Sequence, residues 1–304
     1  MKIFYSDLQP LVLPAGHVYP SDKYVRLRHE LVSQQVISMD QLVPAVPAER
    51  GQILRVHTEE YYDAVCSGTL SPQQLRVLGL PWSERLVTRA HLGVGAVIAA
   101  ARAALQNGAA GSLSGGTHHA FPGEGRGFCV FNDIAVAIED LFANRSIRKA
   151  AIIDADAHQG NGTAAIFADD PRVFILDLYG GKNYPVRRVP ATLDVPLPEN
   201  ADNSLYLETL AQSLPAVLEF QPDVLFYIGG VDPLAGDRFN KMTLTMAGLQ
   251  CRDEMVLESC SNNHIPIVLT MGGGYSAVEI TVQAHINTYH AVKKVFGENQ
   301  RAEK

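Results

Sequence analysis

Short, almost wholly apolar segments recur along this chain, and they limit its fold more than any other feature. Four of them are rich in Val, Ile and Leu and are bounded by Gly, Asp or Pro: 150–153, 173–178, 224–228 and 265–269. Continuous apolar runs of this length are typical of strands in a parallel sheet that is buried on both faces. They alternate with helix-length stretches of 3.6-residue periodicity: 131–142, 204–218, 245–259 and 277–295. The alternation predicts an α/β fold, in which helices flank a parallel sheet.

The length of 304 residues admits either one large α/β domain or two average domains. Two further helices are expected at 24–33 and 84–105, the second long and rich in alanine. With 47% hydrophobic and 19% charged residues, the composition excludes a disordered or collagen-like chain. Because no Pro-, Ser- or charge-rich linker divides the sequence, we predict a single domain over residues 1–304.

The cysteines and the charges indicate the expected surroundings of the chain. Its four cysteines, Cys66, Cys129, Cys251 and Cys260, form no C-x-x-C pair, so reduced thiols and a cytoplasmic location are expected. The first residues, 1–5, form a strand-like segment without signal-peptide features, and we expect no membrane helix. The net charge of −7, without a basic run, argues against nucleic acid as a partner and is compatible with a cationic substrate. No feature indicates an oligomeric state.

Four loops of Gly and polar residues follow strand-like segments: 115–120, 154–163, 229–237 and 272–276. The carboxyl ends of adjacent parallel strands converge on one crevice, where open α/β sheets bind ligands. One site can therefore collect side chains that are distant in the sequence.

Metal-capable side chains stand in two of these loops. Asp154, Asp156 and His158 alternate in sequence, so at the end of a strand they point to one side. Asp232 adds a carboxylate after the segment 224–228. Alternating polar residues at a strand end are often only structural. An Asp, His and Asp set with an open fourth position, however, suits catalytic Zn²⁺, and its oxygen ligands also admit Fe²⁺ or Mn²⁺.

Two histidines and a tyrosine complete the chemically suggestive residues. Tandem histidines such as His118 and His119 are often surface or core residues, but Asp154 and Asn161 offer acceptors that fix the tautomer of an imidazole. The run Gly272-Gly273-Gly274-Tyr275 is either a tight turn or a phosphate nest, or it delivers a phenol to a developing oxyanion. No G-x-G-x-x-G or P-loop pattern occurs, so nucleotide binding has little support.

Taken together, these motifs resemble the zinc-dependent histone deacetylase family, which has the arginase-deacetylase fold. The resemblance is collinear from about residue 5 to residue 275. Its motifs are Gly115-Gly-Thr-His-His-Ala120, Gly127-Phe-Cys-Val-Phe-Asn-Asp133, Asp154-Ala-Asp-Ala-His-Gln-Gly-Asn-Gly162, Gly230-Val-Asp-Pro-Leu-Ala-Gly-Asp-Arg238 and Gly272-Gly-Gly-Tyr275. The stretch from His158 to Gly162 is similar to the class IV branch and its bacterial relatives, whereas other classes commonly carry Asp in place of Asn161.

The resemblance implies roles for individual residues. The implied Zn²⁺ ligands are Asp156, His158 and Asp232. The implied catalytic residues are His118, His119, Tyr275, Asp154 and Asn161. The implied walls of a narrow tunnel for an acyl-lysine stem are Gly127, Phe128 and Tyr184, with Phe239 at the rim. The resemblance also implies a structural K⁺ site at Asp154 and the backbone of Asp156 and His158, to which Asp177 contributes.

The expected reaction is removal of an acetyl or other acyl group from a lysine side chain by metal-activated water. A deacetylase of small amines such as acetylpolyamines shares the same motifs and stays an alternative. A two-metal ureohydrolase or a non-catalytic acyl-lysine-binding module is less compatible with them. Two positions bear on details: Asn161 predicts that His119 is neutral at pH 7, and the small Thr117 predicts room for longer acyl groups at the tunnel floor. His17, in a turn that resembles a family loop near that floor, is left without a role.

Overall fold

Eight parallel strands form one sheet at the centre of the molecule. The computed structural model describes residues 1–7 and 11–302. The strands are β1 (Lys2–Tyr5), β2 (Leu42–Pro44), β3 (Ala109–Ser112), β4 (Ala150–Asp154), β5 (Val173–Gly180), β6 (Leu193–Leu197), β7 (Val224–Ile228) and β8 (Ile267–Thr270). Their order across the sheet is β2-β1-β3-β8-β7-β4-β5-β6. The predicted fold class, a parallel sheet flanked by helices, is therefore confirmed.

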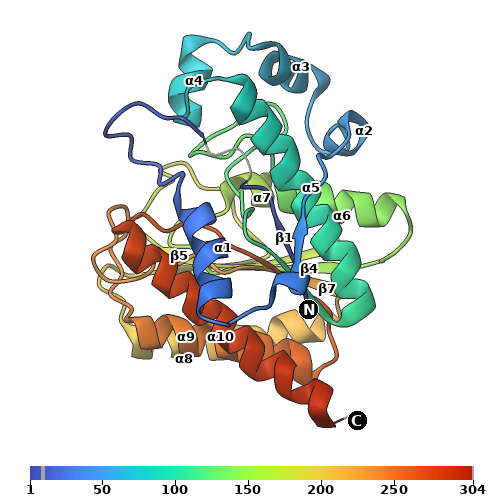
Figure 1. The fold of residues 1–304 in the computed structure, drawn as a ribbon, viewed down its shortest axis with the longest axis vertical. Coiled ribbons are helices and arrows are strands. Elements are labelled where there is room, and N and C mark those ends of the chain that lie inside the picture. Colours follow the sequence, from blue (N-terminus) through green and yellow to red (C-terminus); the bar gives the residue numbers. More distant parts are fainter. Residues whose placement is uncertain (8–10, 303–304) are drawn as a thin grey trace.

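Helices cover both faces of this sheet (Figure 1). In sequence order they are α1 (Lys23–Ser33), α2 (Arg50–Ile53), α3 (Glu59–Ser67), α4 (Pro72–Leu78), α5 (Glu84–Asn107), α6 (Asp133–Ala143), α7 (Asn161–Ile166), α8 (Asn203–Glu219), α9 (Met246–Asn262) and α10 (Val278–Ala302). In the view of Figure 1, α5 and α6 lie above the sheet, and α8, α9 and α10 lie below it. Helix α1 packs against α10.

The two faces of the sheet bury two separate hydrophobic cores, because successive side chains of a strand point to opposite faces. In β4, Ala150 and Ile152 belong to the core between the sheet and helices α5 and α6. Ala151 and Ile153 belong to the core between the sheet and helices α8–α10. This double burial explains why the central strands are apolar without interruption. The edge strands β2 and β6 lack that signal, and β6 contains Pro196, which an edge strand tolerates.

By length and composition alone, helix α5 could span a membrane, whereas no membrane helix was expected from the sequence. Its packing supplies another reason for its composition. It lies against strands β1, β3 and β8 and against α6, and its buried side chains are largely alanine and valine. The small side chains allow the helix to approach the sheet closely, so α5 is a core helix of this fold.

A fully buried arginine on α9 ties the strand ends together. The Arg252 guanidinium donates to the carbonyls of Ala155 and Gly230, at 3.0 and 2.6 Å, and to the adjacent Asp253 carboxylate. Ala155 follows β4 and Gly230 follows β7, so one side chain holds both loops that leave these strands. Asp253 in turn accepts from Tyr227 of β7.

Replacing Arg252 with Met removes these donors while keeping an apolar stem of similar length. Because Asp253 and two carbonyls then stay buried without their partner, we expect the free energy of unfolding to fall by about 3–5 kcal/mol. Urea unfolding measures the change. Arg148→Met, at an exposed arginine, is the matched control and should stay within about 0.5 kcal/mol of the parent. Equal losses in both variants would contradict the proposed tie.

Candidate active site

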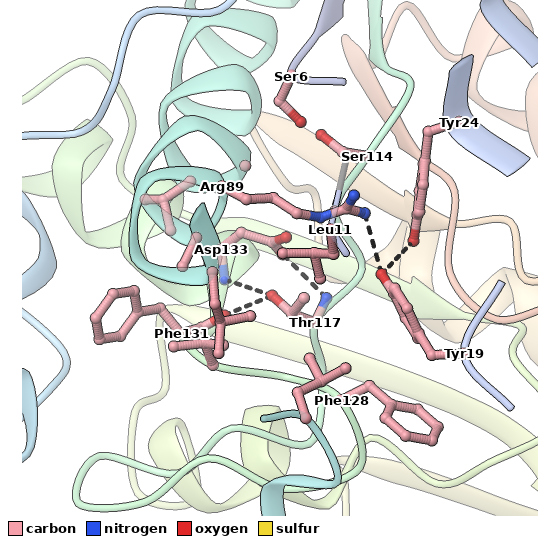
Figure 2. Close-up of a pocket in the computed structure, with 17 residues that line it drawn as sticks. Ser6, Leu11, Tyr19, Tyr24, Arg89, Ser114, Thr117, Phe128, Phe131 and Asp133 are labelled. Atoms are coloured by element: carbon pink, nitrogen blue, oxygen red, sulfur yellow. Dashed lines mark hydrogen bonds between the residues drawn. The ribbon is translucent and has the colours of Figure 1, made fainter. Parts of the chain in front are cut away.

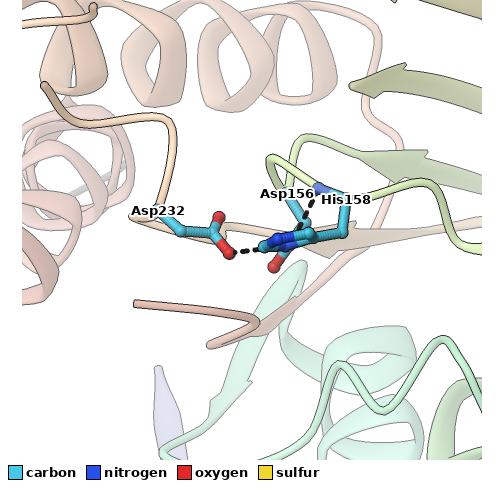
Figure 3. Close-up of side chains that lie close together, drawn as sticks. All are labelled: Asp156, His158 and Asp232. Atoms are coloured by element: carbon cyan, nitrogen blue, oxygen red, sulfur yellow. Dashed lines mark hydrogen bonds and ion pairs between the residues drawn. The ribbon is translucent and has the colours of Figure 1, made fainter. Parts of the chain in front are cut away.

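The candidate metal ligands meet because β4 and β7 are neighbours in the sheet. Asp156 and His158 lie in the loop after β4, and Asp232 lies in the loop after β7. Figure 3 shows the three side chains converging. Nδ1 of His158 is 3.0 Å from Oδ1 of Asp156 and 3.0 Å from Oδ2 of Asp232, and the ligand atoms all lie within 4.8 Å of one another. All three residues are buried.

Backbone groups hold the two carboxylates in place. The Gly273 N–H donates to Oδ2 of Asp156 at 2.6 Å, and the Ala157 N–H donates to Oδ1 of Asp232 at 2.9 Å. A side chain at Gly273 would overlap the Asp232 carboxylate, so this position requires glycine. The Gly-rich loop after β8 is therefore part of the metal-site scaffold, in addition to carrying Tyr275.

The electrostatics of this cluster suit a cation. Burial, together with the charge of Asp156, raises the pKa of Asp232 to about 7. Burial alone would lower the pKa of His158, but Asp156 and Asp232 hold it well above its usual range. Nε2 of His158 donates to the Phe239 carbonyl at 3.2 Å, which leaves Nδ1 to face a metal ion. Two buried carboxylates and one imidazole thus form a site that could hold a divalent metal.

The two histidines occupy the positions expected of a catalytic dyad. Their rings are 4.1 Å apart between centroids, and both are buried. Nδ1 of His118 donates to Asp154 at 2.7 Å, and Nδ1 of His119 donates to the amide oxygen of Asn161 at 3.1 Å. Both acceptors are those that the sequence indicated. In each ring the other nitrogen is free to act on a substrate or water.

The two rings differ in charge because their surroundings differ. Burial disfavours the cation, but Asp154 and Asp156 outweigh it and raise the pKa of His118 to about 9. Burial and the neighbouring His118 and His158 hold the pKa of His119 well below its usual range. His119 is therefore neutral at pH 7, as the amide at Asn161 predicted, and is suited to accept a proton.

Tyr275 lies beside this cluster, with its ring 6.2 Å from that of His158. Burial and the charges of Asp156 and Asp232 raise its pKa well above the usual range, so the phenol stays protonated and can donate. Asp237 fixes its backbone, because Oδ2 of Asp237 accepts from the Tyr275 N–H at 2.6 Å. Oδ1 of the same carboxylate accepts from the Phe239 N–H at 3.0 Å.

Asp237 and Lys23 are site residues that the sequence reasoning missed. Asp237 stands inside a quoted motif, and its acidic side chain five residues beyond Asp232 was the available signal. Lys23 is 3% exposed and donates to the Gly272 carbonyl at 3.3 Å. No sequence pattern indicated that a lysine at the start of α1 would reach the loop after β8.

A cavity of about 450 Å³ leads to these residues, within the usual size range of ligand pockets. Its walls include all four predicted tunnel residues: Gly127, Phe128, Tyr184 and Phe239. The Tyr184 ring stands perpendicular to that of His119, with 4.9 Å between centroids. A side chain at Gly127 would press on the His119 ring, which explains the glycine there.

A second cavity, of about 70 Å³, shares Phe128 with the first. Figure 2 shows the residues that line it. Arg89 lines it and donates to the Tyr19 hydroxyl at 3.1 Å. Thr117 also lines it, but its hydroxyl is engaged with the Phe131 carbonyl at 2.6 Å and with the Asp133 N–H at 3.1 Å. Whether this space takes part of a longer acyl group stays a prediction.

The expected K⁺ site lies around Asp177, in β5. Oδ1 of Asp177 is buried without a hydrogen-bond partner, whereas Oδ2 accepts from the Gly160 N–H at 2.9 Å. An unpartnered carboxylate oxygen near Asp154 fits a monovalent cation, although the ion stays a prediction.

His17 accepts from the Tyr19 N–H and contacts the Gly79 carbonyl. All four cysteines are unpaired in the structure.

Residues 17–291 match the family model of the histone deacetylase domain. The chain belongs to the histone deacetylase family. It is 38% identical to an uncharacterised protein of Picosynechococcus, over 93% of this chain and 95% of that protein. It is 31% identical to histone deacetylase 2 of Arabidopsis thaliana, over 90% of this chain and 74% of that protein. The crystal structure of a histone deacetylase homologue complexed with SAHA has the same fold, with a TM-score of 0.83 at 24% identity and coverage of 97% of this chain and 84% of that one.

Family membership assigns this chain to the amide hydrolases of the deacetylase type. The structure brings every residue that the sequence nominated for the site to one edge of the sheet.

Replacing Asn161 with Asp gives His119 a charged acceptor in the same place. Because the carboxylate stabilises the imidazolium, the pKa of His119 should rise. A base that must be neutral then stays protonated, and inactive, up to a higher pH. We expect the acidic limb of the kcat/KM profile to move upward by at least about one pH unit. Asn161→Gln, which keeps an uncharged amide, is the control. An unchanged acidic limb in Asn161→Asp would show that Asn161 does not set the protonation of His119.

Replacing Asp237 with Ala removes the acceptor of both the Tyr275 and the Phe239 N–H groups. A displacement of about 1 Å at a reacting group can cost about 100-fold in rate, so we expect kcat to fall by about 10–100-fold. Asp237→Asn keeps one acceptor oxygen, so its kcat should lie between those of the parent and of Asp237→Ala. Steady-state kinetics, circular dichroism and bound-metal content distinguish the outcomes. A lower melting temperature with kcat unchanged would assign Asp237 to the fold alone.

Proposed function

We propose that this chain is a zinc-dependent lysine deacylase, which hydrolyses the amide of an acetyl or other acyl group on a protein or peptide lysine. The convergence of Asp156, His158 and Asp232 beside a neutral, hydrogen-bonded His119 carries this proposal. The cavity that opens onto them has aromatic walls at Phe128 and Tyr184, suited to a long unbranched stem. Fe²⁺ is a second candidate for the metal, since the donor set is oxygen-rich.

A divalent ion held by the three ligands would supply a Lewis acid that polarises the acyl carbonyl and lowers the pKa of water. Within this frame, His119 accepts the proton of the attacking water through its free ring nitrogen and later delivers it to the leaving amine. Tyr275 donates a hydrogen bond to the oxygen that gains charge. His118 donates from Nδ1 to Asp154 and lies against His119, with 4.1 Å between the ring centroids.

The test is a release assay on metal-loaded protein. The substrates are an acetyl-lysine peptide, the same peptide with a long-chain acyl group, and an acetylpolyamine. We expect hydrolysis of the peptides, loss of activity with a chelator, and restoration by Zn²⁺ or Fe²⁺. Comparable rates for both acyl lengths would support the room predicted beside Thr117, and a strict acetyl preference would contradict it.

Tyr275→Phe removes only the proposed oxyanion donor, and its kcat should fall by about 100–1,000-fold. Tyr289→Phe is the matched control, because the Tyr289 hydroxyl on α10 is buried without a hydrogen-bond partner and does not line this cavity. Its activity should equal that of the parent. Equal rates in Tyr275→Phe and the parent would remove the oxyanion role. Absence of turnover on every substrate would favour a binding module over an enzyme.

A further inference from the structure

The mouth of the catalytic cavity carries positive charge. Arg76 at the end of α4, Lys182 after β5 and Lys241 before α9 line the cavity together with the aromatic walls. No acidic side chain lines it among the residues that the structure describes. The side chains of Lys182 and Lys241 are 70% and 53% exposed, so their ammonium groups are available to a substrate that rests on the rim.

The nearby acidic residues only partly cancel this charge. Glu199 is shared, since it pairs with Lys182 at 3.2 Å and with Lys241 at 2.8 Å. Glu124 pairs with Arg126 at 2.7 Å. Asp237 is buried and accepts backbone hydrogen bonds, so it faces inward.

Two more exposed arginines lie close in sequence to residues that line the cavity. They are Arg187 and Arg238, in the loops that carry Tyr184 and Phe239. The rim therefore keeps a net positive charge on a chain whose overall charge is −7. The negative overall charge was compatible with cationic substrates, but the local charges at the cavity mouth are positive.

We propose that this cationic rim selects an acyl-lysine that is carried by an acidic protein segment, and that it disfavours acylated polyamines. The inference rests on the proposed deacylase function and names its substrate class. When an acyl-lysine stem fills the tunnel, the residues on either side of it lie over Arg76, Lys182 and Lys241. Acidic neighbours meet opposite charges there. The free ammonium groups of an acylated polyamine meet like charges at the same place.

The test compares peptides that differ only beside the acetyl-lysine, with Glu, Ser or Lys on both sides, and adds acetylspermidine. At low ionic strength we expect kcat/KM to fall from the Glu to the Ser to the Lys peptide, with about 10-fold or more between the extremes. Acetylspermidine should be the poorest substrate. Because exposed charges are screened by salt, the ratio should shrink towards one in 0.5 M NaCl. Equal kcat/KM for the Glu and Lys peptides would overturn the proposal.

Charge reversal assigns the preference to the rim. The double variant Arg76→Glu and Lys241→Glu should reverse the order of the Glu and Lys peptides. The matched control is Arg148→Glu combined with Arg145→Glu, at two exposed arginines between α6 and β4. It changes the net charge equally and should preserve the order. A reversal in both double variants would assign the effect to overall charge and overturn the proposal.

Binding separates this inference from the proposed function. Fluorescence anisotropy of the labelled peptides with metal-loaded Tyr275→Phe protein reports affinity while turnover is slowed by about 100–1,000-fold. Tighter binding of the Glu peptide supports the rim even if no peptide is hydrolysed, in which case only the deacylase function fails. Hydrolysis without any difference in affinity or kcat/KM removes the rim and leaves the deacylase. A single-stranded oligonucleotide that displaces the Glu peptide as well as an unlabelled Glu peptide does would also overturn the choice of an acidic protein segment.

Discussion

Three buried carboxylates, Asp154, Asp156 and Asp232, lie close together at the carboxyl ends of the strands. The surrounding structure depends on how their mutual repulsion is offset. Each receives its own donor. His118 donates to Asp154, the Gly273 N–H donates to Asp156, and the Ala157 N–H donates to Asp232. Buried carboxylates without such donors would take up protons and lose their value as ligands. The loops, the glycines and the histidines around them are therefore arranged mainly by electrostatics.

The same requirement explains why two adjacent histidines have different properties. His118 faces a carboxylate and is held as a cation, whereas His119 faces an amide and is held neutral by burial and by the cation beside it. Sequence neighbours on one loop thus differ in charge because burial and the nearby charges act on them differently.

Much of the fold and of the site was readable from the sequence, for identifiable reasons. Central strands such as β4 and β7 are buried on both faces, so their apolar runs stand out, and the polar side chains that end them point to the crevice. Edge strands such as β6 are half exposed and carry no such pattern. The role of Arg252 was not readable from the sequence, because it acts on two carbonyls that only the tertiary fold brings together. The bond from the Tyr275 N–H to Asp237 likewise depends on that fold. The charge of the cavity mouth escaped detection for a similar reason: Arg76, Lys182 and Lys241 come from three separate segments.

The position of the candidate metal ligands in the loops that follow two neighbouring strands has a consequence for how the chain matures. β4 and β7 pair in space, but β5, β6 and α8 lie between them in the sequence. A growing chain that ends before Asp232 lacks one ligand, and one that ends before Gly273 lacks the N–H group that holds Asp156. Contacts of such long sequence separation form late in folding. A metal ion held by these residues would accordingly bind tightly only to the nearly complete polypeptide, and it would stabilise the finished fold over its precursors.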